Sequence, residues 1–277
     1  MKKINASIVL YHNKKEQLIQ TINSFLNTSL EVKLYLVDNS TNNDLKELEK
    51  IDERIEYIYN DANLGYGTAH NIAMRKSIAE GALYHVVLNP DIYFDAQVIE
   101  ELFLYMQEHH DVGNSIPQVL YPDGEIQYLC KLLPTPSDLI LRRFIPFESY
   151  KKKRNHQYEL RWSGYDKVMN VPSLSGCFMF LRTSALETIG LFDENIFMYL
   201  EDTDLNRRIH SKYKTIFYPK VEIYHEYAKE SYKSKTLLKY HIKSAIYYFN
   251  KYGWIFDKKR DEINQKVQTQ YKKFGFL

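Results

Sequence analysis

The sequence has only two cysteines among 277 residues, Cys130 and Cys177. Two cysteines cannot build a disulfide framework, and they indicate a reducing compartment. No stretch approaches the roughly 20 apolar residues that cross a bilayer as a helix. Met1-Lys2-Lys3 leads into a strand pattern without the apolar segment of a signal peptide. We therefore expect a cytoplasmic protein that is not integral to the membrane.

Net charge is also small, at +2, but it is unevenly placed. Residues 229–277 hold twelve Lys or Arg against four Asp or Glu, a local charge of +8 that leaves −6 for the remainder. A basic, tyrosine-rich segment can bind an anionic surface, whereas the plainer alternative is a solvated helical tail. If this segment docks, we expect its partner to be the anionic inner face of the cell membrane, and not nucleic acid.

Short apolar runs alternate with amphipathic segments over the first 110 residues. Strands are expected at 6–11, 32–37, 55–59 and 84–88, and helices from about 13, from 44, at 68–80 and at 95–109. Further strands are expected at 171–181, 214–218 and 221–225, and an amphipathic helix at 234–253. The alternation predicts an α/β protein with a parallel, doubly wound sheet. We expect a domain at 1–228, with a variable insertion at 112–170, and a basic helical extension at 229–277.

Polar residues follow two early strands, and the carboxyl ends of parallel strands form the usual ligand-binding edge of such a sheet. Asp38 and Asn39 follow the second strand. An ionised carboxylate can accept the ring N–H of uracil or thymine, although Asp-Asn-Ser also makes a local turn.

Asn63-x-Gly65-x-Gly67 opens the next helix and has the outline of a phosphate cradle. It lacks the third glycine of the dinucleotide fingerprint, so it does not indicate a nicotinamide cofactor. We expect this loop to close around a nucleotide, with Asn71 on the inner face of the helix; a simple turn is the alternative.

Two further segments contain residues that could bind a metal ion. In Asn89-Pro90-Asp91 the proline rigidifies the strand end and aims Asp91 outward, although the same residues can simply end a strand. A carboxylate together with diphosphate oxygens is an ordinary site for Mg²⁺ or Mn²⁺. His225 follows the last short strand, and an imidazole ligand would favour Mn²⁺.

The acidic run Glu201-Asp202-Thr203-Asp204 follows an apolar stretch. Carboxylates so close together repel one another, and apolar surroundings raise a carboxyl pKa, as catalysis of proton transfer requires. The alternative is a helix N-terminus whose acids complement the dipole. Upstream, Gly176 can allow a close strand crossing.

Taken together, the motifs resemble the inverting family 2 glycosyltransferases of the GT-A fold, which has a mostly parallel, Rossmann-like sheet with flanking helices. The chain is most similar to the bacterial rhamnosyltransferase-type enzymes of surface polysaccharide synthesis. The resemblance covers about residues 4–230 and rests on an ordered set of motifs: 7–11, 37–40, 63–67, 88–91, 175–179, 192–194, 201–204 and His225.

The resemblance implies a role for each of these candidate residues. Asp202 would be the catalytic base, with Glu201 and Asp204 tuning or orienting it. Asp91 and His225 would hold Mn²⁺ or Mg²⁺, and Ser231 loosely matches a serine that often follows this histidine. The nucleotide-sugar site would comprise Tyr11, Asp38, Asn39, Asn63, Gly65, Asn71, Asn89 and Gly176. Asn89 stands where many relatives have an aspartate.

The implied reaction is a single in-line displacement that moves a sugar from a dTDP- or UDP-linked donor to a glycan or lipid-linked acceptor. One alternative is a sugar nucleotidyltransferase, but only Lys14 and Lys15 lie near the first strand to grip a triphosphate. Another alternative is a non-catalytic protein that binds sugar or nucleotide.

Overall fold

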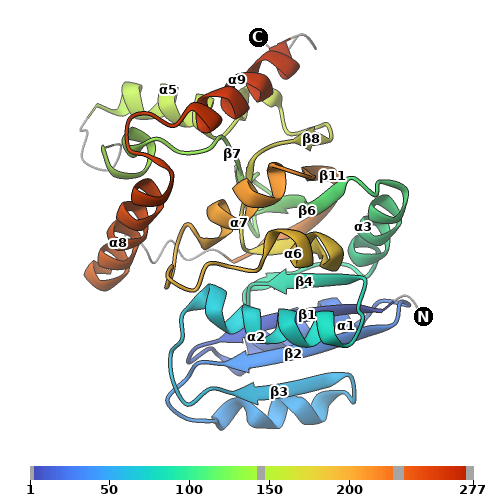
Figure 1. Cartoon of the computed structure of the whole chain (residues 1–277). Helices are drawn as coiled ribbons and strands as arrows, with labels where there is room; N and C mark the ends of the chain where they lie inside the picture. The colour runs from blue at the N-terminus through green and yellow to red at the C-terminus, as the bar shows by residue number, and fades with distance from the viewer. Residues whose placement is uncertain (1–2, 142–146, 227–233, 273–277) are drawn as a thin grey trace.

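Nine strands form one central sheet in the computed structural model, which describes residues 3–141, 147–226 and 234–272. Their order along the sheet is β3-β2-β1-β4-β10-β6-β11-β5, and β8 pairs with β11 outside this path. Helices cover both faces of the sheet, and a helical arm at the C-terminal end packs beside it (Figure 1).

The first half of the sheet is parallel, as the alternating pattern predicts. It consists of β1 (Ile4–Leu10), β2 (Val32–Asp38), β3 (Ile55–Tyr59) and β4 (Tyr84–Leu88). The connections are α1 (Lys15–Leu26), the 3₁₀ helix η1 (Asp44–Ile51) and α2 (Tyr66–Ala79). β1 and β4 are buried throughout, which accounts for their continuous apolar runs.

The second half of the sheet is mixed. β10 (Phe178–Arg182) runs antiparallel between β4 and β6 (Val112–Leu120), and β11 (Lys214–His225) runs parallel to β6. Two short strands, β5 (Ile92–Tyr93) and β8 (Met169–Asn170), pair antiparallel with β11. A separate ladder joins β7 (Cys130–Lys131) to β9 (Ser173–Leu174).

Three details of the sequence prediction are wrong. The strand expected at 171–181 is divided into β9 and β10, which belong to different sheets and are separated by the loop at 175–177. The insertion expected at 112–170 begins with β6, an inner strand of the sheet, so any inserted segment starts after Leu120. The strands expected at 214–218 and 221–225 are one strand, β11, whose pairing with β6 shifts register between Tyr218 and Glu222. Pro219 lies within this register shift. Because proline has no N–H to donate to a neighbouring strand, the sequence suggested that the strand ends there.

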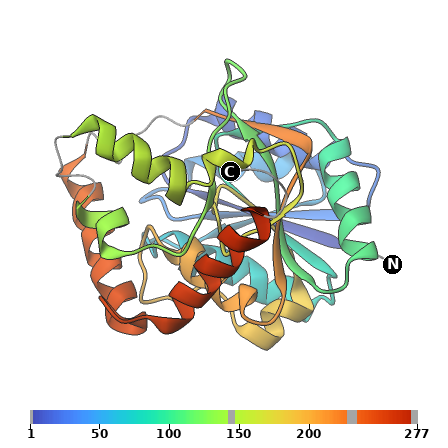
Figure 2. The same cartoon turned by 90° about the horizontal axis from the view of Figure 1, so that it is seen from above.

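The remaining helices flank the second half of the sheet. They are α3 (Gln97–Glu108), η2 (Ser137–Leu141), α5 (Glu148–Tyr158), η3 (Arg161–Ser163), α6 (Thr183–Ile189), α7 (Glu201–His210), α8 (Lys235–Tyr252) and α9 (Lys258–Lys272). Figure 2 shows that α3 lies on one side of the molecule and α8 on the other, while α9 runs from the end of α8 toward the middle. No helix in the described ranges has an apolar stretch that could cross a bilayer.

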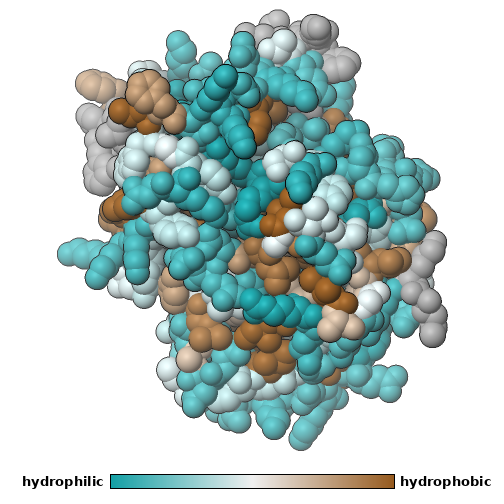
Figure 3. Space-filling view, viewed as in Figure 1, coloured by the Kyte–Doolittle hydropathy of each residue, from teal (hydrophilic) through white to brown (hydrophobic). Residues whose placement is uncertain are grey.

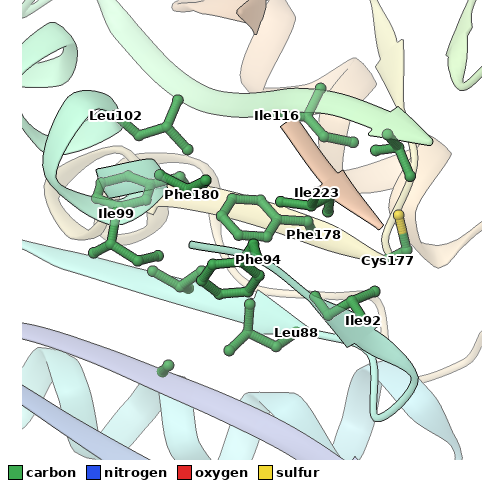
Figure 4. Close-up of a cluster of buried hydrophobic side chains, with 14 of the residues drawn as sticks. Leu88, Ile92, Phe94, Ile99, Leu102, Ile116, Cys177, Phe178, Phe180 and Ile223 are labelled. Carbon is green, nitrogen blue, oxygen red and sulfur yellow. The ribbon is translucent and has the colours of Figure 1, made fainter. Parts of the chain in front are cut away.

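β10 is buried on both faces, which explains its uninterrupted apolar sequence. Phe178 and Phe180 belong to the large core on the α1 and α3 side, where Phe94 packs edge-on against Phe178 (Figure 4). Met179 and Leu181, which alternate with them, belong to a second core with residues of α6 and α7. Because successive side chains of a strand point to opposite faces, one short strand serves both cores. This fixes the loop before β10, which carries Gly176, between β4 and α7.

Candidate active site

The hydroxyl of Tyr66 lies between two of the segments that the sequence predicts to form the site. It lies 2.9 Å from Asn89 Oδ1, at the end of β4, and 2.8 Å from the carbonyl oxygen of Gly176, in the loop before β10. Burial raises the pKa of Tyr66 well above its usual value, and the charges of Glu201, Cys177, Asp202 and Asp91 add to this. Residues that are far apart in sequence therefore surround one phenol.

Asp202 lies half-buried in the first turn of α7, directly beside Gly176. Its Oδ2 accepts a hydrogen bond from the Gly176 N–H at 2.9 Å, and its Oδ1 accepts one from the Thr203 N–H at 2.6 Å. A Cβ at position 176 would lie 3.2 Å from the Asp202 Cβ, so glycine permits this close approach. The Thr203 hydroxyl also donates to Oδ1, at 3.3 Å, whereas Oδ2 keeps a second lone pair at which Asp202 can accept a proton.

The chain enters α7 through two residues in the left-handed region, Tyr199 (φ 67°) and Leu200 (φ 69°). Non-glycine residues in this region cost of order 1 kcal/mol or more each and tend to lie at functional sites. Here the strained turn delivers the acidic run to the end of the sheet.

Glu201 is the buried neighbour of Asp202. Its Oε2 forms no hydrogen bond with the described residues. Burial, followed by the adjacent charge of Asp202, raises the pKa of Glu201 to about 8. At neutral pH Glu201 therefore holds a proton.

Asp204 has a different role from the one that the sequence predicts. It is fully buried, its Oδ1 accepts from Lys251 Nζ and the Tyr252 hydroxyl at 2.7 Å each, and its Oδ2 accepts from Arg208 Nε at 2.8 Å. Positions two apart on a helix point to different faces. These contacts attach α7 to α8, and the structure does not bring Asp204 beside Asp202.

Asp91 and His225 meet as predicted, with His225 Nε2 3.3 Å from Asp91 Oδ1. Asn89 Nδ2 lies 3.4 Å from the same imidazole nitrogen. Burial would lower the pKa of His225, but Asp91 and Cys177 raise it to about 10. In this geometry the imidazole is a cation paired with Asp91, and a metal ion bound through Nε2 would displace its proton.

Gln127 orients the ring of His225. Its Oε1 lies 3.0 Å from His225 Nδ1, while its Nε2 donates to the carbonyl oxygens of His225 at 2.8 Å and Leu120 at 3.2 Å. Because the amide nitrogen already faces two carbonyls, its oxygen faces Nδ1, so Nδ1 carries the hydrogen. The Nε2 atom is thereby turned toward Asp91. No motif in the sequence around Gln127 predicts that it orients His225.

The residues around Asp91 fit a divalent cation in part. Asp91 Oδ1 is buried and, apart from its ion pair with His225 Nε2, has no partner among the described residues. The described part of the chain holds no group of three or more His, Cys, Asp or Glu that could bind a metal. A cation here would therefore need ligands from outside the protein, such as diphosphate oxygens and water, which is normal for Mg²⁺ and Mn²⁺.

Asp38 is fully buried. Its Oδ1 accepts from the Ser40 N–H at 2.8 Å, and its Oδ2 accepts from the Tyr57 hydroxyl at 2.6 Å. The carboxylate braces the turn after β2, which is the local alternative that the sequence left open. Its direct contact with a base stays a prediction, and it would require this turn to open.

The loops after β2 and β3 meet as expected. Asn39 Nδ2 donates to the Gly65 carbonyl oxygen at 3.1 Å, and Asn63 Oδ1 accepts from the Gly65 N–H at 3.0 Å. Gly65 has a φ of +86°, and a Cβ there would lie 2.4 Å from the Phe197 carbonyl oxygen, so only glycine fits. Tyr11, at the end of β1, is 51% exposed and is the accessible aromatic ring of the predicted nucleotide set.

Asn71 has a structural role that the sequence did not predict. Its Nδ2 donates to the Phe192 carbonyl oxygen at 2.9 Å and to Glu194 Oε1 at 3.0 Å, and its Oδ1 accepts from the Phe192 N–H at 3.0 Å. These bonds hold segment 192–194 against α2 and occupy both ends of the amide. Ser231, the loosely matched serine, lies outside the described residues.

The fold is that of the GT-A glycosyltransferases, as solved structures show. The structure titled GalNAc-T7 with UDP, GalNAc and Mn2+ superposes with a TM-score of 0.62 at 14% identity, over 81% of this chain and 43% of that one. Residues 1–349 of S. aureus TarS in complex with UDP superpose with a TM-score of 0.57 at 14% identity, over 96% of this chain and 70% of that one. The chain thus spans less than half the length of the first of these structures.

Residues 7–190 match the sequence profile described as glycosyl transferase family 2, so the chain belongs to that family. A Mycobacterium tuberculosis protein named N-acetylglucosaminyl-diphospho-decaprenol L-rhamnosyltransferase is 27% identical over 83% of this chain and 78% of its own length. The Haloferax volcanii low-salt glycan biosynthesis hexosyltransferase Agl10 is 27% identical over 72% of this chain and 59% of its own. Family and fold both agree with the resemblance drawn from the sequence.

Proposed function

We propose that the protein is an inverting glycosyltransferase of cell-surface polysaccharide synthesis. It transfers a sugar, rhamnose in the simplest case, from a dTDP- or UDP-linked donor to a glycan or lipid-linked acceptor. The observation that carries the proposal is the Tyr66 hydroxyl, within hydrogen-bond distance of both Asn89 and Gly176. It joins the Asp91–His225 pair on one side to Asp202 on the other. The mycobacterial relative, named for rhamnosyl transfer to a lipid diphosphate, supports the choice of sugar and acceptor.

Asp202 acts as the base. It takes the proton of an acceptor hydroxyl while that oxygen attacks the anomeric carbon of the donor sugar. The bond to the nucleoside diphosphate breaks in the same step, so the configuration inverts and no covalent enzyme intermediate forms. The Gly176 N–H, at 2.9 Å from Oδ2, keeps the carboxylate in one orientation.

Glu201, which is buried, supports this role by carrying a proton beside the half-buried carboxylate of Asp202. Burial, followed by the adjacent charge of Asp202, raises the pKa of Glu201 to about 8, so Glu201 holds a proton at neutral pH. A protonated Glu201 adds no second negative charge beside the proposed base.

Asp91 and His225 would hold a divalent cation, which when bound would offset negative charge on the departing diphosphate. The mixed oxygen and nitrogen donor set favours Mn²⁺ over Mg²⁺. The GalNAc-T7 structure of the same fold was solved with Mn2+ and UDP, which supports a divalent cation near a nucleotide diphosphate. Residues 121–170, beyond β6, are the proposed acceptor side, and we place the reaction at the cytoplasmic face of the membrane.

A donor panel tests the proposal. Purified full-length protein is incubated with dTDP- and UDP-linked sugars, Mn²⁺ and a polyprenyl-diphosphate-linked acceptor, and release of nucleoside diphosphate is followed together with the glycosylated lipid. We expect turnover with one donor class and its loss in Asp202→Asn. Nucleotide binding without turnover over the whole panel would favour a non-catalytic binding protein, and pyrophosphate release from a nucleoside triphosphate would favour a nucleotidyltransferase.

A further inference from the structure

The turn between α8 and α9 exposes three consecutive large apolar side chains. Trp254 is 39% exposed, Ile255 74% and Phe256 91%. Figure 3 shows hydrophobic surface at the upper left of the molecule, where this turn lies in Figure 1. Exposed apolar residues in isolation are ordinary, but a contiguous group at a projecting turn marks a surface that contacts something apolar.

The turn is held rigidly. Gly253 has a φ of +111°, and a Cβ there would lie 2.6 Å from the Phe256 carbonyl oxygen. Directly after Phe256, the buried Asp257 accepts two hydrogen bonds from Arg207 on α7, at 2.7 Å and 2.8 Å. The Trp254 indole N–H donates to Asn250 Oδ1 at 2.8 Å. The apolar tip therefore projects from a fixed support, which lowers the entropy cost of binding.

A basic stripe leads to this tip along the exposed face of α8. Lys235, Lys239 and Lys243 are exposed and spaced by four residues, so they share one face of the helix. Ile246, 42% exposed, continues the same stripe toward the turn. α8 contains no Asp or Glu, and two more exposed lysines, 258 and 259, follow the tip at the start of α9.

We infer that this face of α8 and the 254–256 tip dock on an anionic bilayer. Ile255 and Phe256 enter the headgroup and acyl boundary, Trp254 lies at the interface, and the lysine stripe contacts lipid phosphates. Amphipathic helices with lysines on one side and Trp, Phe or aliphatic residues beside them bind membranes in this way. A tip of three side chains is small for a stable protein interface, which buries roughly 800 Å² per partner.

The inference deepens the proposed function, because docking would bring the protein to a lipid-linked acceptor. Its evidence, however, is the exposed tip and the charge of α8. Binding to lipid can therefore be measured without donor or acceptor, and a failure of docking can be told apart from a failure of glycosyl transfer.

Vesicle flotation tests it, using the full chain and vesicles of either phosphatidylcholine alone or phosphatidylcholine with phosphatidylglycerol. We expect wild type to float with the anionic vesicles and to be released by salt. The double variant Ile255→Ser/Phe256→Ser should partition at least about tenfold less, because two apolar side chains no longer enter the bilayer. Lys239→Gln/Lys243→Gln should weaken binding to anionic vesicles only.

Leu104→Ser is the matched control, because Leu104 is 55% exposed but lies on α3, on the other side of the molecule. It should float like wild type. Thermal melting checks that each variant is folded, and quenching of Trp254 by brominated lipids, in a Trp162→Phe background, reports contact with the acyl region.

The inference is overturned if wild type does not float, if Ile255→Ser/Phe256→Ser floats as well as wild type, or if Leu104→Ser fails equally. A concentration-dependent dimer in the absence of lipid, lost in the same double variant, would assign the tip to self-association instead. Transfer to a water-soluble acceptor should be unchanged in the tip variants, which separates docking from chemistry.

Discussion

The N–H of Gly176 donates a hydrogen bond to Asp202 Oδ2 at 2.9 Å, across 26 positions of the chain. The two residues are so close that a Cβ on residue 176 would lie 3.2 Å from the Asp202 Cβ. The glycine both orients the proposed base and leaves the space in which that base stands. It links the loop before β10 to the first turn of α7.

Gly176→Ala should displace Asp202 by a few tenths of an ångström or more. Because catalysis depends on the position of the base, we expect kcat to fall roughly 10- to 100-fold while donor binding changes little. Ser175→Ala, at the neighbouring position, is the control and should keep wild-type kcat. Steady-state kinetics with a separate measurement of nucleotide affinity check this, and an unchanged kcat in Gly176→Ala would contradict the assigned role of the pair.

Asp202→Asn and Asp204→Asn form a matched pair on one helix. Asp202→Asn should lower kcat by about 100-fold or more, since a positioned base contributes this much, with little loss of stability. Asp204→Asn should instead lower the free energy of unfolding by about 2–3 kcal/mol, because Lys251 and Arg208, each still partly exposed, lose the buried carboxylate that pairs with them. Urea unfolding and kinetics on both variants separate the two roles; the reverse pattern would exchange them.

Glu201 should make stability depend on pH. Burial and Asp202 raise its folded-state pKa to about 8, whereas an unfolded Glu has a pKa of about 4.3. Between these values the folded chain keeps a proton that the unfolded chain releases, so the contribution of Glu201 to stability falls as pH rises, by up to about 1.4 kcal/mol per pH unit. This contribution is fully present below the pKa of the unfolded state and is lost above the pKa of the folded state.

Glu201→Gln should therefore gain stability relative to wild type as pH rises through this window, as measured by urea unfolding at several pH values. Adding Asp202→Asn to both proteins should shorten the pH range over which their stabilities diverge, because the like charge that helps to raise the pKa of Glu201 is gone. A difference between Glu201→Gln and wild type that does not vary with pH would show that Glu201 is ionised in the folded protein.

Gln127→Leu should release the ring of His225. Loss of such a partner typically weakens metal affinity by about 10- to 100-fold, so we expect that loss for Mn²⁺ binding measured by electron paramagnetic resonance. The nitrogen chemical shifts of His225, from spectra of ¹⁵N-histidine-labelled protein, should report loss of the hydrogen bond from Nδ1 to Gln127 Oε1. Gln118→Leu, on β6, is the control. Unaltered shifts and Mn²⁺ affinity in Gln127→Leu would remove Gln127 from the proposed site.

The sequence by itself determined the framework of the site. The strands of the first half are buried apolar runs whose period and turn residues are local properties, so β1 to β4 and α2 could be predicted. The order of the motifs was sufficient to indicate the family. The resemblance also placed Asp91 beside His225, and the structure brings the two together through the antiparallel pairing of β5 with β11, in which Ile92 lies opposite His225.

Only the tertiary structure decided which polar side chains face the site. Asp202 and Asp204 look equivalent in sequence, yet one lies beside Gly176 and the other is buried against α8, because their directions depend on where α7 packs. Gln127 reaches His225 from a loop without any motif. The exposure of the 254–256 tip follows from the Arg207–Asp257 pair, which joins α7 to the start of α9. Contacts between distant segments set these features, and no local pattern encodes them.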